Sequence, residues 1–250
     1  YNDVAILYRT NAQSRALEEK LMIHNIPYKI YGGQNFYQRK EIKDILAYLK
    51  TIDNGLDGQA VKRIINVPKR GIGNTTIDRL QEYADFNDIT FWEALVNAKD
   101  IDTIKNAALS KLEPFVDLIG RLRAKEEFMS LKELAEAVIE DTGYIESLSQ
   151  NETVEEVEAR RENLDEFINK VVSYEEGCKE AGEEPTLSGL LEEVALIADI
   201  DNLDESEPHV MLMTLHSAKG LEFPIVYMTG MEDGLFPSYM TIVSDDSTEI

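Results

Sequence analysis

A polar connection, HSAKGLEF at residues 216–223, separates two apolar runs at 210–215 and 224–228, each predicted to be a buried strand. His216, Lys219 and Glu222 place an imidazole, an ammonium and a carboxylate close together along the chain. Such groups at the mouth of two core strands are suited to a charged ligand. The alternative is a surface turn in which Gly220 takes a positive φ and the lysine is solvated.

A second polar stretch, YRTNAQSR, follows an apolar run at the start of the chain and leads into a predicted helix. At that edge of an α/β sheet Arg9 could pair with a phosphate, to which Thr10, Asn11 and Ser14 could donate hydrogen bonds. The free N–H groups of the first helical turn would add to anion binding. The alternative is simple capping of the helix by Thr10 or Asn11 beside a solvated arginine.

The stretch VPKRGIGNTT at residues 67–76 lies between two predicted helices and resembles a helix-hairpin-helix DNA-binding element. The glycines at 71 and 73 would let the backbone approach a phosphate, while Ile72 anchors the hairpin in the core. Lys69 and Arg70 would supply positive charge without reading base sequence. The alternative is a helix–helix turn that needs glycine only for its backbone angles.

The stretch FYQRKEIKD brings Arg39, Lys40 and Lys43 within about one helical turn, above an aromatic pair. These cations could form a basic patch that contacts nucleic acid. The alternative is a solvated helix face on which Glu41 and Asp44 pair with these cations.

Composition indicates a packed globular chain of 250 residues whose net charge of −23 is unevenly distributed. Residues 1–80 carry 13 Lys and Arg against 8 Asp and Glu, whereas the remaining residues carry 12 against 40. The first part could therefore meet a polyanion, and the second could not do so readily. No G-x-x-x-x-G-K-[ST], H-E-x-x-H or Ser/His/Asp arrangement occurs, and the single cysteine, Cys178, favours a reducing cytoplasm. The sequence predicts no metal site and no membrane span.

Periodicity predicts β/α structure at both ends and helices between them. A strand at 3–8, a helix at 12–24 and a short strand before Gly32 begin the chain, and helices then run from Arg39 to about Ala198. Strand character returns at 210–215. We expect this strand to pair with residues 3–8, which would bring the 216–223 connection beside YRTNAQSR.

Four stretches in order, AILYRTNAQSR, GGQNFYQRKEIKDILAYLK, NVPKRGIGNTTID and MTLHSAKGLEFPIVYMTGMEDGLFP, resemble superfamily 1 DNA helicases of the PcrA/UvrD/Rep type. The resemblance implies an α/β plus all-α fold, in which a partial RecA-like parallel-sheet domain (2A) is interrupted by a large helical insertion (2B). It places 2A at residues 1–31 and 206–250, with the second part truncated, and 2B at residues 32–205. We therefore expect the sequence to be a piece of a longer protein.

The resemblance also implies roles for individual residues. Single-stranded DNA would be contacted by Arg9, Thr10, Asn11, Thr214 and His216. The ribose of ATP would be bound by Glu222 in the motif that contains Gly220. Duplex DNA would be contacted by Arg39, Lys40, Lys69, Arg70, Gly71, Ile72, Gly73, Asn74 and Thr75.

The implied activity is ATP-dependent 3′-to-5′ unwinding of DNA in repair or replication, with ATP and Mg as cofactors of the full-length enzyme. The catalytic Walker residues would lie before Tyr1, so this segment alone is expected to bind no cofactor and to hydrolyse no ATP. Its partners would be single-stranded DNA, the single-strand/duplex junction and, through the acidic helices, repair or transcription proteins. The alternative function is an acidic helical module that recruits such proteins without catalysis. A helicase–nuclease subunit is a third reading, but no nuclease carboxylate cluster is apparent in the sequence.

Overall fold

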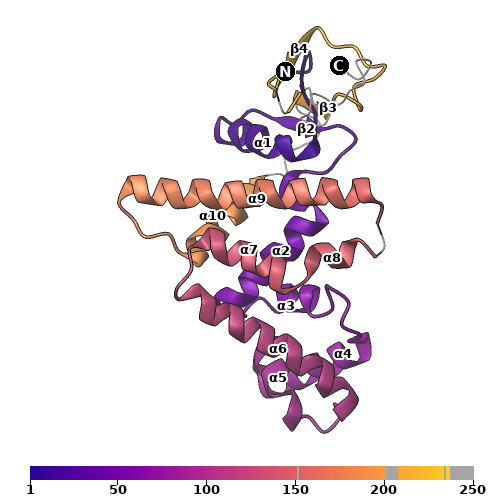
Figure 1. The fold of residues 1–250 in the computed structure, drawn as a ribbon, viewed down its shortest axis with the longest axis vertical. Coiled ribbons are helices and arrows are strands. Elements are labelled where there is room, and N and C mark those ends of the chain that lie inside the picture. Colours follow the sequence, from indigo (N-terminus) through magenta and orange to yellow (C-terminus); the bar gives the residue numbers. More distant parts are fainter. Residues whose placement is uncertain (151, 201–207, 234, 237–250) are drawn as a thin grey trace. The chain divides into compact units, whose positions relative to one another are not determined.

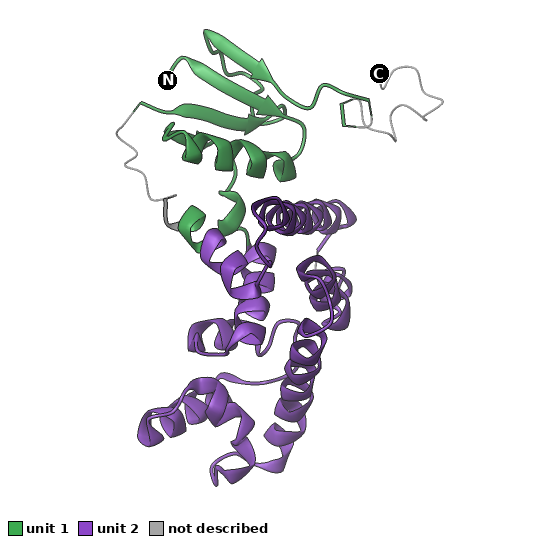
Figure 2. Cartoon of the chain, turned by 90° about the vertical axis from the view of Figure 1, so that its left-hand side faces the viewer, with its two compact units in different colours: residues 1–39, 195–250 green, residues 40–194 purple. Residues whose placement is uncertain are grey.

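The structure is a computed structural model that describes residues 1–150, 152–200, 208–233, 235 and 236. The chain divides into two compact units, shown in different colours in Figure 2. Unit 1 comprises residues 1–39 and 195–250, and unit 2 comprises residues 40–194. In the described part of the chain no helix is long and apolar enough to cross a bilayer.

Unit 1 contains a parallel four-stranded sheet with the order β2-β3-β1-β4. Strand β3, Val210–Thr214, pairs with β1, Val4–Tyr8, which confirms the predicted pairing of these two segments. The outer strands are β2, Tyr28–Ile30, and β4, Ile225–Met228. Unit 1 also contains three helical elements. They are the 3₁₀ helix η1, Asn11–Gln13, the helix α1, Ser14–Ile23, and the 3₁₀ helix η2, Phe36–Gln38.

One face of the sheet is packed against α1. Tyr8, Ile30 and Leu212, one residue from each of three strands, form its buried cluster, against which Leu17 and Leu21 of the helix pack. The predicted helix at 12–24 thus packs on the sheet through these leucines, which lie four residues apart on one helix face.

The prediction that residues 224–228 form a buried strand is wrong in its burial. Strand β4 forms, but Ile225, Val226, Tyr227 and Met228 are 47–59% exposed. The strand pairs with β1 on one side only and is an edge of the sheet over the described residues. The apolar run at 224–228 thus predicts that a strand forms here. It does not predict burial, because burial depends on whether another part of the protein covers the strand.

The secondary-structure elements described in unit 2 are all helices, joined by loops (Figure 1). Its helices are α2 Lys40–Asp53, α3 Gly58–Ile64, α4 Asn74–Asn87, α5 Phe91–Val96, η3 Ala98–Asp100, α6 Asn106–Glu126, α7 Leu131–Asp141, α8 Tyr144–Leu148, α9 Val154–Ala181 and α10 Leu187–Ile200, the last of which continues into unit 1.

Three of these helices begin with a capping box that the sequence spells out. Thr90, Ser130 and Thr153 precede α5, α7 and α9, and each has a glutamate three positions later. The N-cap hydroxyl accepts the glutamate N–H, and the glutamate carboxylate accepts the N-cap N–H. These hydrogen bonds satisfy donors that a helix start otherwise leaves unpaired.

Helix α2 is the central helix of unit 2, in contact with α3, α6, α7 and α9. Ile42, Ile45 and Leu49 of this helix are at most 1% exposed, and Tyr48 and Ile52 are buried with them. The recurrence of these side chains every three or four residues gives α2 a continuous apolar face.

The interpretation of Glu41 and Asp44 as solvated partners of nearby cations is wrong. Both side chains are only 2% exposed. Glu41 accepts hydrogen bonds from Arg160 at 2.5 Å and Asn163 at 2.6 Å. Asp44 accepts from Arg63 Nε and Tyr144 Oη, each at 2.7 Å. A carboxylate removed from water needs such partners, and here they come from α3, α8 and α9.

The stability of unit 2 is predicted to depend on Arg160, which bridges Glu41 and Glu152, each at 2.5 Å. Arg160→Ala leaves a buried carboxylate without its cation, so the free energy of unfolding should fall by about 3 kcal/mol. Urea denaturation followed by far-ultraviolet circular dichroism measures this change.

The neighbouring Arg161→Ala is the matched control, since that exposed side chain pairs only with Glu158 at 3.6 Å. It should change stability by less than about 0.5 kcal/mol. Equal unfolding midpoints for the two variants would show that the ion pair between Arg160 and the buried Glu41 does not contribute to stability.

Candidate nucleic-acid interface

Three loops of unit 1 meet at the carboxyl edge of its parallel sheet. Leu215 N donates to Tyr8 O at 2.9 Å, directly after β3 and at the end of β1. The guanidinium Nη1 of Arg9 lies 3.5 Å from His216 Nδ1. After β2, a Cβ added at Gly32 would lie 3.2 Å from Ser217 Oγ. The expected proximity of the YRTNAQSR and HSAKGLEF stretches is therefore confirmed.

The YRTNAQSR stretch is folded by a side chain that sequence reasoning passed over. Gln13 Oε1 accepts the N–H of Arg9 at 2.8 Å and the N–H of Thr10 at 3.2 Å. The Thr-x-x-Gln spacing of a capping box was the available signal. Arg9 and Thr10 are half-buried and Asn11 is exposed, which leaves polar atoms of this stretch accessible at the sheet edge.

The loop after β3 forms a compact turn. Thr214 Oγ1 accepts the N–H of Ser217 at 3.1 Å and lies 3.0 Å from its Oγ. The predicted positive φ of Gly220 is confirmed at +88°, with open space around its α-carbon. His216 and Glu222 are exposed. The hydroxyl of Thr214 thus shapes the loop, while the imidazole and carboxylate remain accessible to a ligand.

Arg39 lies inside unit 1. It is 7% exposed, donates to Ser14 Oγ at 2.7 Å and to Gln34 O at 3.3 Å, and stacks 5.1 Å from the centroid of the Phe36 ring. Its guanidinium also lies 3.9 Å from the buried carboxylate of Glu18. Arg39 therefore holds the segment after β2 against α1, an arrangement that leaves Lys40 as the accessible cation of this pair.

The hydroxyl of Tyr8 is the one buried side-chain polar atom without a hydrogen-bond partner among the described residues. Burial raises the pKa of Tyr8 to about 12, with the Glu18 carboxylate adding to the rise and Arg39 opposing it. The phenol is therefore neutral at physiological pH and contributes no charge beneath Arg9.

In unit 2 the predicted hairpin joins α3 to α4, and its arginine and isoleucine hold it in place. Arg70 Nη1 donates to Ile64 O at 2.9 Å, and Nη2 donates to Tyr48 Oη at 2.6 Å. Asn66 Oδ1 accepts the N–H groups of Arg70 and Ile72, at 2.8 and 3.2 Å. The predicted anchoring role of Ile72 is confirmed, since its side chain is 4% exposed.

The outer surface of the hairpin combines exposed lysine, glycine and small polar residues. They are Lys69, Gly71, Gly73, Asn74 and Thr75. Gly73 is the N-cap of α4, has no side chain to occupy the N–H groups of the first turn, and has nothing within 4 Å of an added Cβ. Gly71 needs its glycine because φ is +72°. The surface therefore presents free helical N–H groups to an anion.

Two further lysines belong to this neighbourhood. Lys111 of α6 donates to Gly71 O at 2.8 Å, a contact between residues 40 positions apart that no local pattern could reveal. Lys40 and Lys69 line a common cavity of about 350 Å³. Among the described residues no cluster of three or more His, Cys, Asp and Glu side chains is placed to hold a metal ion.

A family model described as "UvrD-like helicase C-terminal domain" matches residues 1–249. The chain belongs to this family. A relative named "ATP-dependent DNA helicase PcrA" from Staphylococcus aureus (strain Mu50 / ATCC 700699) is 47% identical over all 250 residues. The protein of the same name from Staphylococcus epidermidis (strain ATCC 12228 / FDA PCI 1200) is 45% identical over the same length. The chain spans 34% of the length of each of these relatives.

Family membership confirms the resemblance inferred from the four sequence stretches. It does not by itself assign a DNA contact to any residue, so those roles rest on the placement described above.

The two hairpin glycines are predicted to differ in what they tolerate. Gly71→Ala puts a side chain at φ +72° and brings its Cβ within 3.3 Å of Lys111 Nζ, so unfolding should become easier by about 1–2 kcal/mol. Gly73→Ala leaves an ordinary φ of −88° and meets no atom, so its cost should be about 0.5 kcal/mol, the difference in N-cap preference. Urea denaturation of both variants tests this, and a larger loss at Gly73 would contradict it.

Proposed function

We propose that this UvrD-like chain is the part of an ATP-dependent 3′-to-5′ DNA helicase that supplies its single-strand contacts, duplex contacts and part of its ATP site. The relatives that match it along its entire length are named as ATP-dependent DNA helicases. The proposed 2A, at residues 1–31 and 206–250, falls within the parallel-sheet unit of residues 1–39 and 195–250. The proposed 2B, at residues 32–205, contains the whole helical unit of residues 40–194 and extends beyond it at both ends.

Single-stranded DNA is proposed to bind at the carboxyl edge of the unit 1 sheet. The observation that carries this assignment is the approach of Arg9 to His216, since it gathers the polar ends of β1 and β3 at one edge. Arg9, Thr10 and Asn11 then contact the strand from one loop, and Thr214 and His216 from the other. Basic and hydroxyl groups of this kind grip the sugar–phosphate backbone without selecting a base sequence.

The nucleotide is proposed to meet the same loop at Glu222 and Gly220. An exposed carboxylate accepts hydrogen bonds from ribose hydroxyls, and the open α-carbon of Gly220 allows close approach of a ligand. His216 is six positions before Glu222, so one loop touches both ligands. ATP with Mg supplies the phosphoryl-transfer chemistry in the whole protein, and these residues bind and orient the ribose side.

Duplex DNA is proposed to bind unit 2 at the hairpin between α3 and α4. Phosphate is contacted by Lys69, the free N–H groups at Asn74 and Thr75, and the glycine backbone at 71–73. Lys40 faces the same cavity as Lys69 and extends the positive surface. Arg70 and Ile72 take part by fixing the hairpin rather than by touching phosphate, because their polar and apolar groups are engaged within unit 2.

Duplex binding is predicted to weaken in Gly73→Ala by several-fold, because a methyl group obstructs close approach of a phosphate while the fold is nearly unchanged. Lys69→Gln should reduce the steepness of the log affinity against log salt plot by about 0.9, the loss of one phosphate contact. Fluorescence anisotropy with a forked DNA, at several salt concentrations, measures both effects.

Lys179→Gln on α9 is the charge-matched control for Lys69→Gln, since Lys179 is exposed and lies outside the hairpin. Its salt slope should equal that of the unchanged chain. An absence of forked-DNA binding even at low salt would contradict the duplex role and favour the protein-recruiting alternative.

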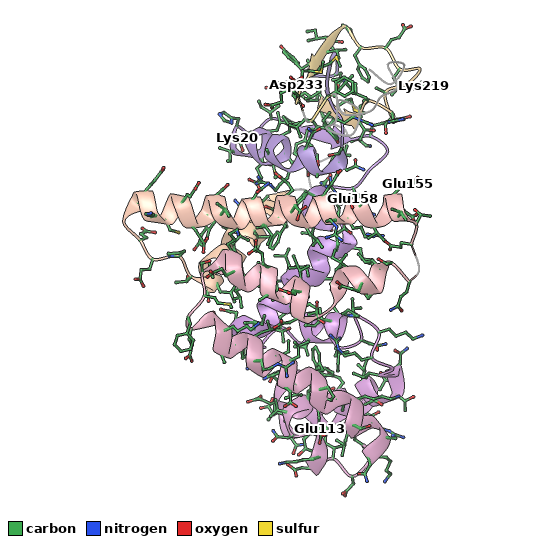
Figure 3. The ribbon with its side chains drawn as sticks, in the orientation of Figure 1. Lys20, Glu113, Glu155, Glu158, Lys219 and Asp233 are labelled. Carbon is green, nitrogen blue, oxygen red and sulfur yellow. The ribbon has the colours of Figure 1, made fainter. Side chains whose placement is uncertain are left out.

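Single-strand binding is predicted to weaken in Arg9→Gln, with a fall of about 0.7 in the steepness of the salt plot for an oligothymidylate. Lys20→Gln serves as the control in the same unit. Lys20 is an exposed cation on α1, labelled with Lys219 of the loop after β3 in Figure 3. Equal loss in the two variants would show that binding reflects net charge and would rule out a specific contact by Arg9.

A further inference from the structure

A groove on unit 2, remote in sequence from the hairpin, is walled by α7, α8 and α9. Its volume is about 480 Å³. Three half-buried isoleucines, Ile139, Ile145 and Ile168, line it, one from each helix. The proposed DNA contacts do not use these residues.

The apolar floor lies at the margin of the packed core of unit 2. Helices α7 and α9 pack against each other, and Leu134, Val138, Leu164 and Phe167 on these helices are at most 2% exposed. Ile139 and Ile168 each follow directly after one of these core positions and remain partly accessible. Burial of the remaining surface of such side chains by a partner would be favourable, at about 25 cal/mol per Å².

The rim of the groove carries more carboxylates than cations. In the described part of the chain Glu140, Glu146 and Asp165 have no ion-pair partner. The two cations that also line the groove are already paired, Lys132 with Glu136 at 2.8 Å and Arg161 with Glu158 at 3.6 Å. The groove therefore has an excess of negative charge around an apolar floor.

The environment of Asp165 is consistent with this excess. Partial burial is the main cause that raises the pKa of its carboxyl, the nearby Arg161 opposes the rise, and Glu158 adds to it. A cationic side chain of a ligand placed beside Asp165 would stabilise the ionised form of its carboxylate.

We propose that this groove docks a short basic amphipathic helix of another protein, with aliphatic side chains on Ile139, Ile145 and Ile168 and lysines or arginines against Glu140, Glu146 and Asp165. Positions 132 and 140 of α7 both line the groove, so this wall is about 12 Å long, or roughly two helical turns. That length suits anchors spaced i, i+4 and i+7 on a docked helix. DNA is disfavoured there because the unpaired carboxylates repel phosphate.

The probe is a fluorescein-labelled synthetic peptide of about 12 residues, roughly three helical turns, with leucines at i, i+4 and i+7 and lysines or arginines at the flanking positions. A second peptide of identical composition has its leucines out of helical register. Anisotropy titrations with the 250-residue chain, at about 0.15 M salt to limit long-range attraction, compare the two. The amphipathic peptide is expected to bind at least about tenfold more tightly, a difference of about 1.4 kcal/mol.

Two triple variants with the same change in net charge distinguish binding in the groove from non-specific attraction of the basic peptide to an acidic protein. Combining Glu140→Lys, Glu146→Lys and Asp165→Lys should lower the affinity for the amphipathic peptide by at least about tenfold. Glu113→Lys, Asp117→Lys and Glu155→Lys make the same change in net charge at exposed positions that do not line the groove, and should alter affinity by less than about twofold. Figure 3 labels Glu113 on α6 and Glu155 near the start of α9. Circular dichroism checks that both triple variants remain folded.

The isoleucine δ1 methyl signals in carbon–proton NMR spectra provide an independent readout. Those of Ile139, Ile145 and Ile168 should shift when the amphipathic peptide is added, while that of Ile72 in the hairpin should not. The proposal is overturned if the two peptides bind equally, if the control triple variant loses as much affinity as the groove variant, or if the shifts appear away from the groove. Shifts of these three methyl signals on addition of forked DNA without the peptide would assign the groove to nucleic acid and would also overturn it.

Discussion

The burial of two carboxylates on one helix constrains the architecture of unit 2. Glu41 and Asp44 lie one turn apart on α2, and both are withdrawn from water. Their partners are Arg63 on α3, Tyr144 on α8, and Arg160 and Asn163 on α9. Because unpaired burial of either charge would be strongly unfavourable, the positions of three other helices are specified relative to α2 by these contacts. Tyr48, one turn beyond Asp44, ties the hairpin to α2 in a similar way, because its hydroxyl accepts a hydrogen bond from Arg70.

This arrangement separates the residues that build the hairpin from those that face outward. Arg70 spreads its hydrogen bonds over backbone carbonyls and Tyr48, and its guanidinium lies 5.0 Å from the centroid of the Phe115 ring. What remains on the outside is backbone, a lysine and short polar side chains. A surface of this composition has little capacity to distinguish one base pair from another, which is consistent with the sequence-independent duplex contact proposed for the hairpin.

Much of the fold follows from local patterns, while the partners of charged residues do not. The apolar runs at 3–8 and 210–215 predict strands, and the need to satisfy their backbone groups predicts their pairing. The glycines at 71 and 220 likewise predict positive φ. By contrast, Arg39, Glu41 and Asp44 are charged residues in charged stretches, and only long-range packing decides that they are buried. The same holds for Arg70, which packing leaves half-buried. The exposure of β4 shows the converse, because an apolar run does not specify whether a neighbour covers it.

The strand order has a consequence for the timing of synthesis. Among the described residues, strand β3 lies between β2 and β1, so these two strands do not pair with each other and gain their shared neighbour only when residues 210–214 have been made. At about 5–20 residues per second this interval lasts on the order of 10–40 s, during which the whole of unit 2 leaves the ribosome. The helical unit can thus form from its own contacts before β1 and β2 are joined by β3.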